Sequence, residues 1–251
     1  RPDKCPSCGG NDLAQDTDTF DTWFSSGQWP VNTLKTSREG DFDYFYPTSV
    51  MNTAYEILFL WVARMIMFGI YLTKEVPFRV ALINGVLRDE QARKMSKSLG
   101  NGVNPNEAIE RYGADAVRMA LLAGRDPGND LMISRQQMEE RIRGYRNFSN
   151  KIWNIARFVL DFEIRDDTAN EVNEDDVLIL RELKETNTSV TGDLEQYRLG
   201  NAAEKLYQFV WHKFADVYLE KIKDRKEEAS PTLRRVLASS LKLLHPFVPF
   251  V

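Results

Sequence analysis

Two lysines, Lys94 and Lys97, are the residues of this sequence best suited to chemistry. They stand three positions apart, with Ser96 between them, Ser98 directly after them and Gly100 closing the segment. Such a loop offers ammonium and hydroxyl donors and no negative charge. It therefore suits a leaving polyphosphate, whose developing charge is stabilised by ammonium groups. A solvated basic loop is the commoner meaning of two lysines at this spacing, so the rest of the chain must decide.

An α/β unit is expected to hold this loop. The pattern predicts an apolar helix over residues 53–72 and a buried strand over residues 78–83, which ends at Asn84-Gly85. The Lys94 loop would then lie just beyond the carboxyl end of a strand, where open α/β sheets place ligands. The segment 18–47 before this unit is aromatic and turn-rich, with no sustained period.

The chain after Pro105 has a helical pattern throughout. Ser134 is expected to cap a long helix, and residues 161–176 read as a linker. Further helices are predicted over residues 177–197 and 201–223, and a last one begins at Ser230-Pro231. The repeating positions of the long helix alternate in steps of four and three: Met138, Ile142, Tyr145, Ser149, Ile152, Ala156 and Val159. The back half is therefore predicted to be a helix bundle.

Composition indicates a globular, cytoplasmic protein of one large or two ordinary domains. The chain has 251 residues, 43% of them hydrophobic, and a net charge of −4. Its longest apolar run, residues 57–72, is interrupted by Arg64 and Gly69 and is shorter than the roughly 20 residues of a membrane span, so we expect a buried helix and no membrane partner. The chain begins with Arg1 and shows no signal-peptide pattern, so we expect it to be a piece of a longer protein.

Cys5 and Cys8, the only cysteines, resemble a zinc knuckle, in which a tight turn aims two thiolates at one point. Structural zinc takes four ligands. The only histidines, His212 and His245, are far away in a helical region. The pair is either half of a zinc site completed elsewhere in the parent protein, or a plain turn.

The string Lys94-Met95-Ser96-Lys97-Ser98 resembles the KMSKS signature of class I aminoacyl-tRNA synthetases. Further blocks in the same order resemble the valyl-tRNA synthetase branch of that family. Isoleucyl and leucyl enzymes stay open as alternatives, although the isoleucyl enzymes are expected to have an acidic residue in place of Ser25. The matching blocks are residues 21–27, 53–65, 88–93, 112–118, 126–130, 146–148 and 150–154.

The resemblance implies which residues act on ATP, which the family uses with Mg²⁺. Lys94 and Lys97 correspond to the catalytic lysines that neutralise the pyrophosphate while the valine carboxylate attacks the α-phosphorus, and Lys97 is expected to contact the nucleotide most directly. Ala54 and Glu56 replace a glycine and an aspartate of the family, and Asn84 replaces a histidine. The implied ATP-binding residues are Ala54, Glu56, Asn84, Gly85, Lys94, Met95, Ser96, Lys97 and Ser98.

Trp23, Ile57 and Trp61 match the positions that wall the valine pocket in the family. Ile57 and Trp61 are four residues apart and would share one helix face. Ordinary core packing is the alternative for such residues.

The resemblance also implies a fold and partners. We expect the second half of a Rossmann-type catalytic domain (residues 1–133) and an all-α anticodon-binding bundle (residues 134–251), mostly helical overall. The family's HIGH-type motif and its editing domain do not occur here. The expected function is activation of valine and its transfer to tRNA(Val), with an isolated chain inactive. A non-catalytic tRNA-binding module is the second hypothesis. The basic side chains that could contact tRNA lie on the long helix: Arg141, Arg143, Arg146, Lys151 and Arg157.

Overall fold

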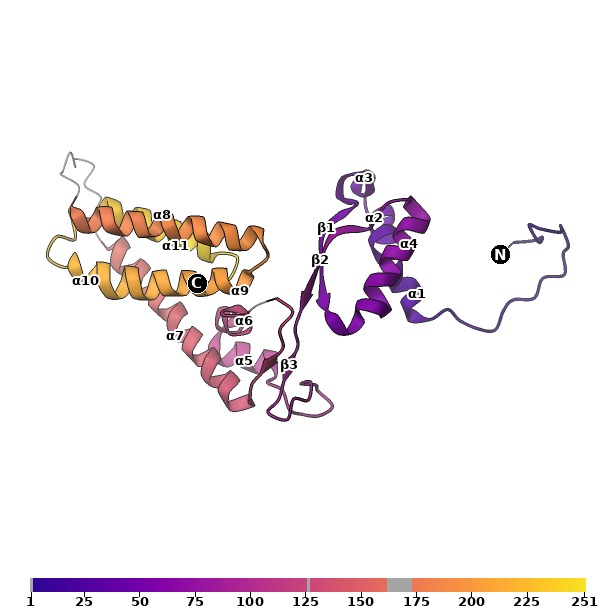
Figure 1. Ribbon diagram of the computed structural model, residues 1–251, viewed down its shortest axis with the longest axis horizontal. Helices are drawn as coiled ribbons and strands as arrows, with labels where there is room; N and C mark the ends of the chain where they lie inside the picture. The colour runs from indigo at the N-terminus through magenta and orange to yellow at the C-terminus, as the bar shows by residue number, and fades with distance from the viewer. Residues whose placement is uncertain (1, 126, 162–172) are drawn as a thin grey trace. The chain divides into compact units, whose positions relative to one another are not determined.

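The computed structural model describes residues 2–125, 127–161 and 173–251. The chain forms two units, Arg1–Ile83 and Asn84–Val251 (Figure 1). Each unit has its own apolar core. The domain boundary expected after residue 133 stays a prediction.

Three short helices occupy the segment for which the sequence showed no period. They are α1 (Thr22–Gly27), α2 (Trp29–Thr36) and α3 (Asp41–Phe45). Local signals begin each of them: the Asp21 carboxylate accepts from the Trp23 N–H, a proline lies in the first turn of α2, and Gly40 adopts a left-handed φ of 86° before α3. Helices of five to eight residues are too short to show a repeating apolar face.

A β-α-β unit follows, of which the helix and the second strand were predicted and the first strand was not. Strands β1 (Thr48–Ala54) and β2 (Phe78–Asn84) form a two-stranded sheet. The intervening helix begins with a 3₁₀ turn, η1 (Tyr55–Ile57), continues through a π turn, η2 (Leu58–Val62), and ends as α4 (Ala63–Thr73). The prediction that this helix starts at Thr53 is wrong, because Thr53 and Ala54 belong to β1.

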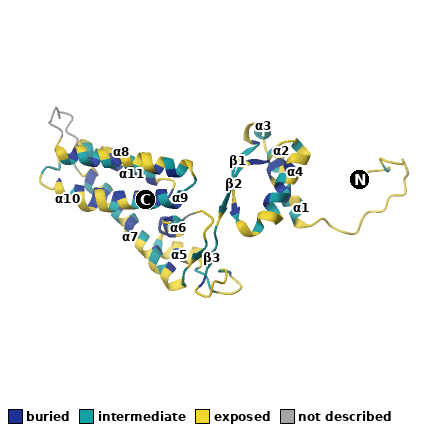
Figure 2. Cartoon of the chain, in the orientation of Figure 1, coloured by how far each residue is buried: buried dark blue, intermediate teal, exposed yellow. Residues whose placement is uncertain are grey.

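The prediction that this apolar helix is buried is wrong for the described residues. Only 17% of its most apolar window is buried (Figure 2). Its contacts are with the short helices α1 and α2 and, through Val62 and Met65, with Phe78 of the small sheet. Phe59 is 82% exposed and Tyr71 is 73% exposed. By length and composition Tyr55–Thr73 could cross a membrane. A helix that another part of a protein covers has the same composition, so this property alone indicates no span.

The second unit starts with a small layer that packs on the long helix. Strands β3 (Leu87–Arg88) and β4 (Leu131–Met132) pair in parallel, with Leu87 opposite Leu131. Helices α5 (Pro105–Tyr112) and α6 (Ala114–Leu122) lie between them in sequence. Most of their buried apolar residues share one core with Met138 and Ile142 of helix α7 (Arg135–Leu160), whereas Met119 of α6 packs in the core of the bundle.

The long helix α7 confirms the predicted start. Ser134 accepts from the Gln137 N–H, and the Gln137 side chain accepts from the Ser134 N–H, which is a capping box. Among the predicted core positions Met138, Ile142, Ile152 and Val159 are buried, whereas Tyr145, Ser149 and Ala156 are half-buried. Phe148 and Ile155 complete the buried face.

The bundle is completed by α8 (Glu174–Glu195), α9 (Leu199–Gln208), the π segment η3 (Phe209–Tyr218), α10 (Leu219–Lys221) and α11 (Ser230–Leu244). The expected linker lies largely outside the described residues, and its last residues form the first turn of α8. Ser230 is not a helix cap: it is the first residue of α11, and its Oγ is buried without a hydrogen-bond partner. These helices enclose one apolar core.

Candidate functional site

The Lys94 loop begins as a narrow hairpin after β3. The Met95 N–H donates to the Leu87 carbonyl at 2.9 Å, and the Asp89 N–H donates to the Arg93 carbonyl at 2.9 Å. Ala92 closes the hairpin turn with a left-handed φ of 59°, a conformation that costs a residue with a Cβ about 1–2 kcal/mol. The backbone thus fixes the position from which Lys94 leaves the stem.

The serines of the loop hold its turn. Ser96 Oγ lies 3.1 Å from Ser98 Oγ and accepts from the Leu99 N–H at 3.3 Å. The Gly100 N–H donates to the Ser96 carbonyl at 3.2 Å, and Gly100 supplies the left-handed φ of 62° that ends the turn. Lys97 is exposed on this turn, so its ammonium group can reach a ligand in solvent.

Most of the predicted ATP-binding residues of the second unit line one cavity of about 830 Å³. Its floor is apolar, from helices α5, α6 and α7, and includes Val117 and Ile142. Its rim carries the ammonium and amide donors of the loop. Ser98 does not line it, and Ala54 and Glu56 belong to the other unit. The predicted residues at this cavity are Asn84, Gly85, Lys94, Met95, Ser96 and Lys97.

Gly85 makes the close backbone approach that shapes one wall of this cavity. A Cβ atom at Gly85 would lie 1.9 Å from the Asn129 carbonyl oxygen and 2.6 Å from the Asp130 nitrogen. Neighbouring contacts hold the two segments together: the Val86 N–H donates to the Asp130 carboxylate at 2.8 Å, and Arg88 Nε donates to the same carboxylate at 2.5 Å. A glycine is therefore needed here for packing, whatever its contact with a nucleotide.

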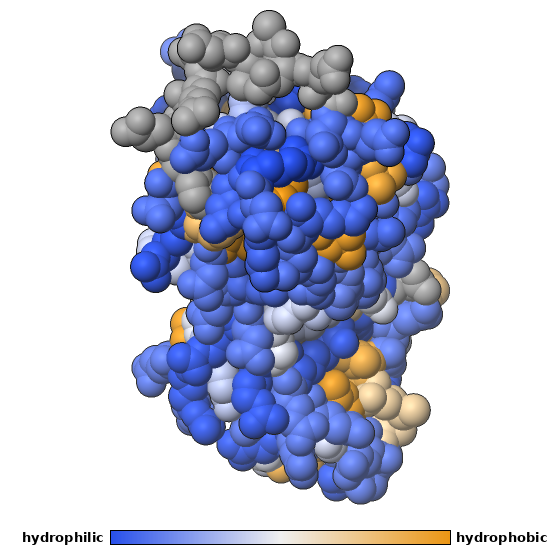
Figure 3. Space-filling view, turned by 90° about the vertical axis from the view of Figure 1, so that its left-hand side faces the viewer, coloured by the Kyte–Doolittle hydropathy of each residue, from blue (hydrophilic) through white to orange (hydrophobic). Residues whose placement is uncertain are grey.

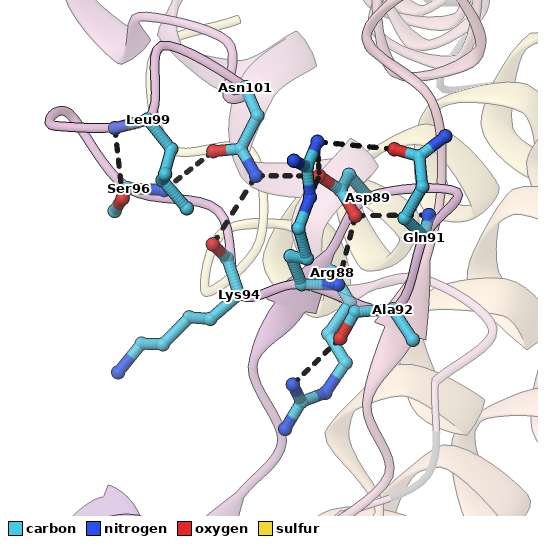
Figure 4. A network of polar contacts seen from close by, with 9 residues as sticks. Arg88, Asp89, Gln91, Ala92, Lys94, Ser96, Leu99 and Asn101 are labelled. Carbon is cyan, nitrogen blue, oxygen red and sulfur yellow. Dashed lines mark hydrogen bonds and ion pairs between the residues drawn. The ribbon is translucent and has the colours of Figure 1, made fainter.

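Asp89 and Asn101 form a polar network behind the loop (Figure 4) that sequence reasoning had assigned no role. Asp89 is 6% exposed, and its carboxylate accepts from Asn101 Nδ2 at 2.8 Å and from Arg93 Nε at 2.9 Å. These hydrogen bonds lower the pKa of Asp89 to about 2. The sequence offered a signal only for the ion pair of Asp89 and Arg93, which are four residues apart. Asn101 lies twelve residues after Asp89, and no spacing rule predicts a contact at that distance.

In the first unit, Trp61 is the predicted pocket residue that lines a cavity, one of about 980 Å³. Its Nε1 donates to the Ser26 carbonyl at 3.0 Å, which fixes the indole ring against α1. Trp23 and Ile57 are half-buried and do not line this cavity. Their assignment to an amino-acid pocket stays a prediction.

An ion pair joins α1, which carries Trp23, to α4. Arg64 NH1 donates to the Asp21 carboxylate at 2.9 Å, and the same carboxylate accepts from the Trp23 N–H at 3.0 Å. The Trp23 N–H and Arg64 both lower the pKa of Asp21. The start of α1 is thereby held next to the apolar helix.

Cys5 and Cys8 lie in a tight turn, closed by the Gly9 N–H donating to the Cys5 carbonyl at 2.8 Å. Hydrogen bonds from Cys8 and Ser7 lower the pKa of the Cys5 thiol, which favours the thiolate that binds zinc. The described residues contain no cluster of three or more His, Cys, Asp or Glu side chains. The donors fit half of a tetrahedral site, so the zinc assignment stays a prediction.

The basic residues of α7 divide into two groups. Arg141 donates to the carbonyls of Ala120 and Ala123 at the end of α6, and Lys151 pairs with Asp216 at 3.1 Å, so both have structural contacts. Arg143, Arg146 and Arg157 are exposed. The bundle end of the chain is mostly hydrophilic with scattered apolar patches (Figure 3).

Comparisons with known proteins relate the chain to tRNA synthetases. The family model of tRNA synthetases class I (I, L, M and V) matches residues 3–134, and that of the anticodon-binding domain of tRNA ligase matches residues 176–251. The valine--tRNA ligase of Clostridium tetani is 45% identical over 99% of this chain, and that of Clostridium perfringens is 46% identical over 100%. The chain spans 29% and 30% of the lengths of these two relatives.

Two solved structures share the fold. The ternary complex of Agrobacterium radiobacter K84 agnB2 LeuRS with tRNA and LeuAMS aligns over 98% of this chain and 32% of that protein, with a TM-score of 0.75 and 24% identity. The Mycobacterium tuberculosis methionyl-tRNA synthetase, in complex with methionyl-adenylate, aligns over 86% of this chain and 44% of that protein, with a TM-score of 0.65 and 23% identity. The predicted fold, a Rossmann-type α/β part followed by a helix bundle, is confirmed.

Proposed function

Because the chain belongs to the class I tRNA synthetases (I, L, M and V), we propose that it contributes part of the ATP site and the anticodon-binding bundle of a valine--tRNA ligase. In the first step the valine carboxylate attacks the α-phosphorus of ATP, the bond to the β-phosphate breaks, and pyrophosphate leaves. In the second step a ribose hydroxyl of tRNA(Val) takes the valyl group, and AMP leaves. ATP enters as its Mg²⁺ complex.

The observation that carries this proposal is the cavity beside the Lys94 loop. Asn84 and Gly85, at the end of β2, line it together with Lys94, Ser96 and Lys97 of the loop, and their donors suit an anionic ligand. Lys94 and Lys97 would place positive charge against the pyrophosphate as the α–β bond breaks. Such preorganised charge acts on the transition state more than on the bound substrate.

Valine, rather than isoleucine or leucine, is the proposed amino acid. The relatives that match the whole chain at 45% and 46% identity are valine--tRNA ligases. The proposed pocket is walled by Trp23, Ile57 and Trp61, and Glu56 is proposed to accept from the ATP ribose hydroxyls. A pocket for a small branched side chain is set by the shape of its walls.

The bundle is the proposed tRNA(Val)-binding region. The match of residues 176–251 to the anticodon-binding domain supports this role. Arg143, Arg146 and Arg157, exposed on α7, are proposed to contact the phosphate backbone of the tRNA. Cys5 and Cys8 would hold a structural zinc ion together with ligands from outside the described residues. We also propose that the protein is cytoplasmic.

Amino-acid-dependent exchange of pyrophosphate into ATP by the complete ligase tests this function. We expect exchange with valine, and much weaker exchange with isoleucine, leucine and threonine. Equal or stronger exchange with isoleucine or leucine would favour that enzyme instead. Binding of tRNA without exchange for any amino acid would favour the non-catalytic module.

A further inference from the structure

The side chain of Asn101 closes the Lys94 loop into a ring. Its Oδ1 accepts from the Ser96 N–H at 2.9 Å, and its Nδ2 donates to the Lys94 carbonyl at 3.3 Å and to Asp89 Oδ2 at 2.8 Å (Figure 4). One amide thus uses its acceptor and its donors at once. The backbone between Lys94 and Ser96 is tied to a residue that lies beyond the end of the turn.

Asp89 anchors this amide to the hairpin stem. Besides Asn101, its carboxylate accepts from the N–H groups of Gln91 and Arg93, at 3.1 and 2.9 Å, and from Arg93 Nε at 2.9 Å. All of these partners are donors, so a carboxylate satisfies them and an asparagine would not. Because Asp89 is 6% exposed, water competes weakly for these bonds.

We infer that Asp89 and Asn101 are positioning residues for adenylate formation, holding the loop backbone so that Lys94 and Lys97 meet the nucleotide in one arrangement. The side chain of Lys94 extends away from the network, so the pair acts through the backbone (Figure 4). Neither residue lines the cavity beside the loop. This inference rests on the proposed function.

The test uses the complete ligase with Asn101→Ala and Asp89→Asn. A misplacement of about 1 Å costs on the order of 100-fold in rate, so we expect each variant to slow single-turnover adenylate formation by about tenfold to 100-fold. The KM for valine should change little, because the loop does not form the proposed valine pocket. The matched control is Glu139→Gln, which removes a partly exposed ion pair with Arg135 on α7 and should keep the wild-type rate.

An interchange variant separates positioning from general damage. In the double variant Asp89→Asn with Asn101→Asp, the amide and the carboxylate change places, so the bond between them can form again and residue 101 still offers an acceptor to the Ser96 N–H, although its bond to the Lys94 carbonyl is lost. We expect it to react faster than the single variant Asn101→Asp, in which two carboxylates face each other. A double variant no faster than Asn101→Asp would contradict the pairing.

Hydrogen exchange of the loop amides gives a readout independent of catalysis. In Asn101→Ala the Ser96 amide should lose protection, whereas in Glu139→Gln it should not. Unchanged protection of the Ser96 amide would overturn the tether. Wild-type adenylation rates in both Asn101→Ala and Asp89→Asn would overturn its role in positioning. A wild-type ligase without valine-dependent exchange would instead overturn the proposed function, while loss of Ser96 protection would still support the tether.

Discussion

Replacing Gly85 by alanine should destabilise the second unit, because the backbone of another segment occupies the space of the added methyl group. The new Cβ would lie 1.9 Å from the Asn129 carbonyl oxygen, well inside the 3.4 Å at which ordinary contact begins. The obstructing atoms belong to the backbone, so no rotamer change can relieve the overlap. The two segments must separate.

The cost follows from what that separation breaks. The Leu131 N–H donates to the Val86 carbonyl at 3.0 Å, and the Val86 N–H donates to Asp130 at 2.8 Å. Overpacking costs about 1–3 kcal/mol and each lost hydrogen bond about 0.5–1.5 kcal/mol, which together give about 2–6 kcal/mol. For a unit of this size the midpoint of thermal unfolding should fall by roughly 4–24 °C.

Calorimetry of wild-type chain, Gly85→Ala and Gly144→Ala measures this effect. Gly144 lies inside α7 with nothing within 4 Å of an added Cβ, so the same substitution there should raise the free energy of unfolding by about 0.8–1 kcal/mol. Opposite signs at the two sites would confirm that the close approach is the cause. Unfolding of Gly85→Ala at or above the wild-type temperature would refute it.

Three further predictions concern other parts of the chain. Burial raises the pKa of Asp115, so ionisation costs stability as pH rises above about 4; the melting temperature of Asp115→Asn, which still accepts from the Phe250 N–H, should therefore increase relative to wild type as pH rises from about 4, and a difference that stays constant with pH would contradict this. Cys5 and Cys8 supply two zinc ligands, so the 251-residue chain should lose zinc to a mild chelator, and one tightly held ion per chain, measured by metal analysis, would disprove the half-site. Ile57→Ala in the complete ligase should raise exchange with isoleucine relative to valine, since an extra methylene gains ~1–3 kcal/mol once there is room, and an unchanged ratio would make Ile57 core packing.

Local signals in the sequence predicted the elements that depend on local contacts. The Ser134 cap, the strand Phe78–Asn84 and the bundle all follow from spacing and residue type, although the prediction that this strand is buried is wrong, because only Phe78 is buried in it. The short helices in residues 22–45 were not predicted, because each is marked only by a cap or turn at its start and is too short to show a repeating apolar face. The π turn η2 could not be predicted, because a helical period of 3.6 residues in the sequence does not distinguish a π turn from an α-helix.

Contacts between distant residues set the limits at the site. The floor of the cavity beside Lys94 is formed by residues of three helices, and no sequence motif predicts how these helices pack together. The bond between Asp89 and Asn101 and the approach of Asn129 to Gly85 depend on how the loop folds back. The exposed helix Tyr55–Thr73 shows the opposite failure: its composition predicts burial, but coverage depends on neighbours rather than on its own residues.

The rate of valyl-adenylate formation in a single turnover of the complete ligase, wild type against Lys97→Ala, tests the central claim most directly. Loss of one charge-assisted contact to the developing negative charge costs about 3 kcal/mol, so the rate should fall roughly 100-fold while the Kd for valine stays the same. An unchanged rate, or a fall explained wholly by weaker valine binding, would contradict the role assigned to the Lys94 loop.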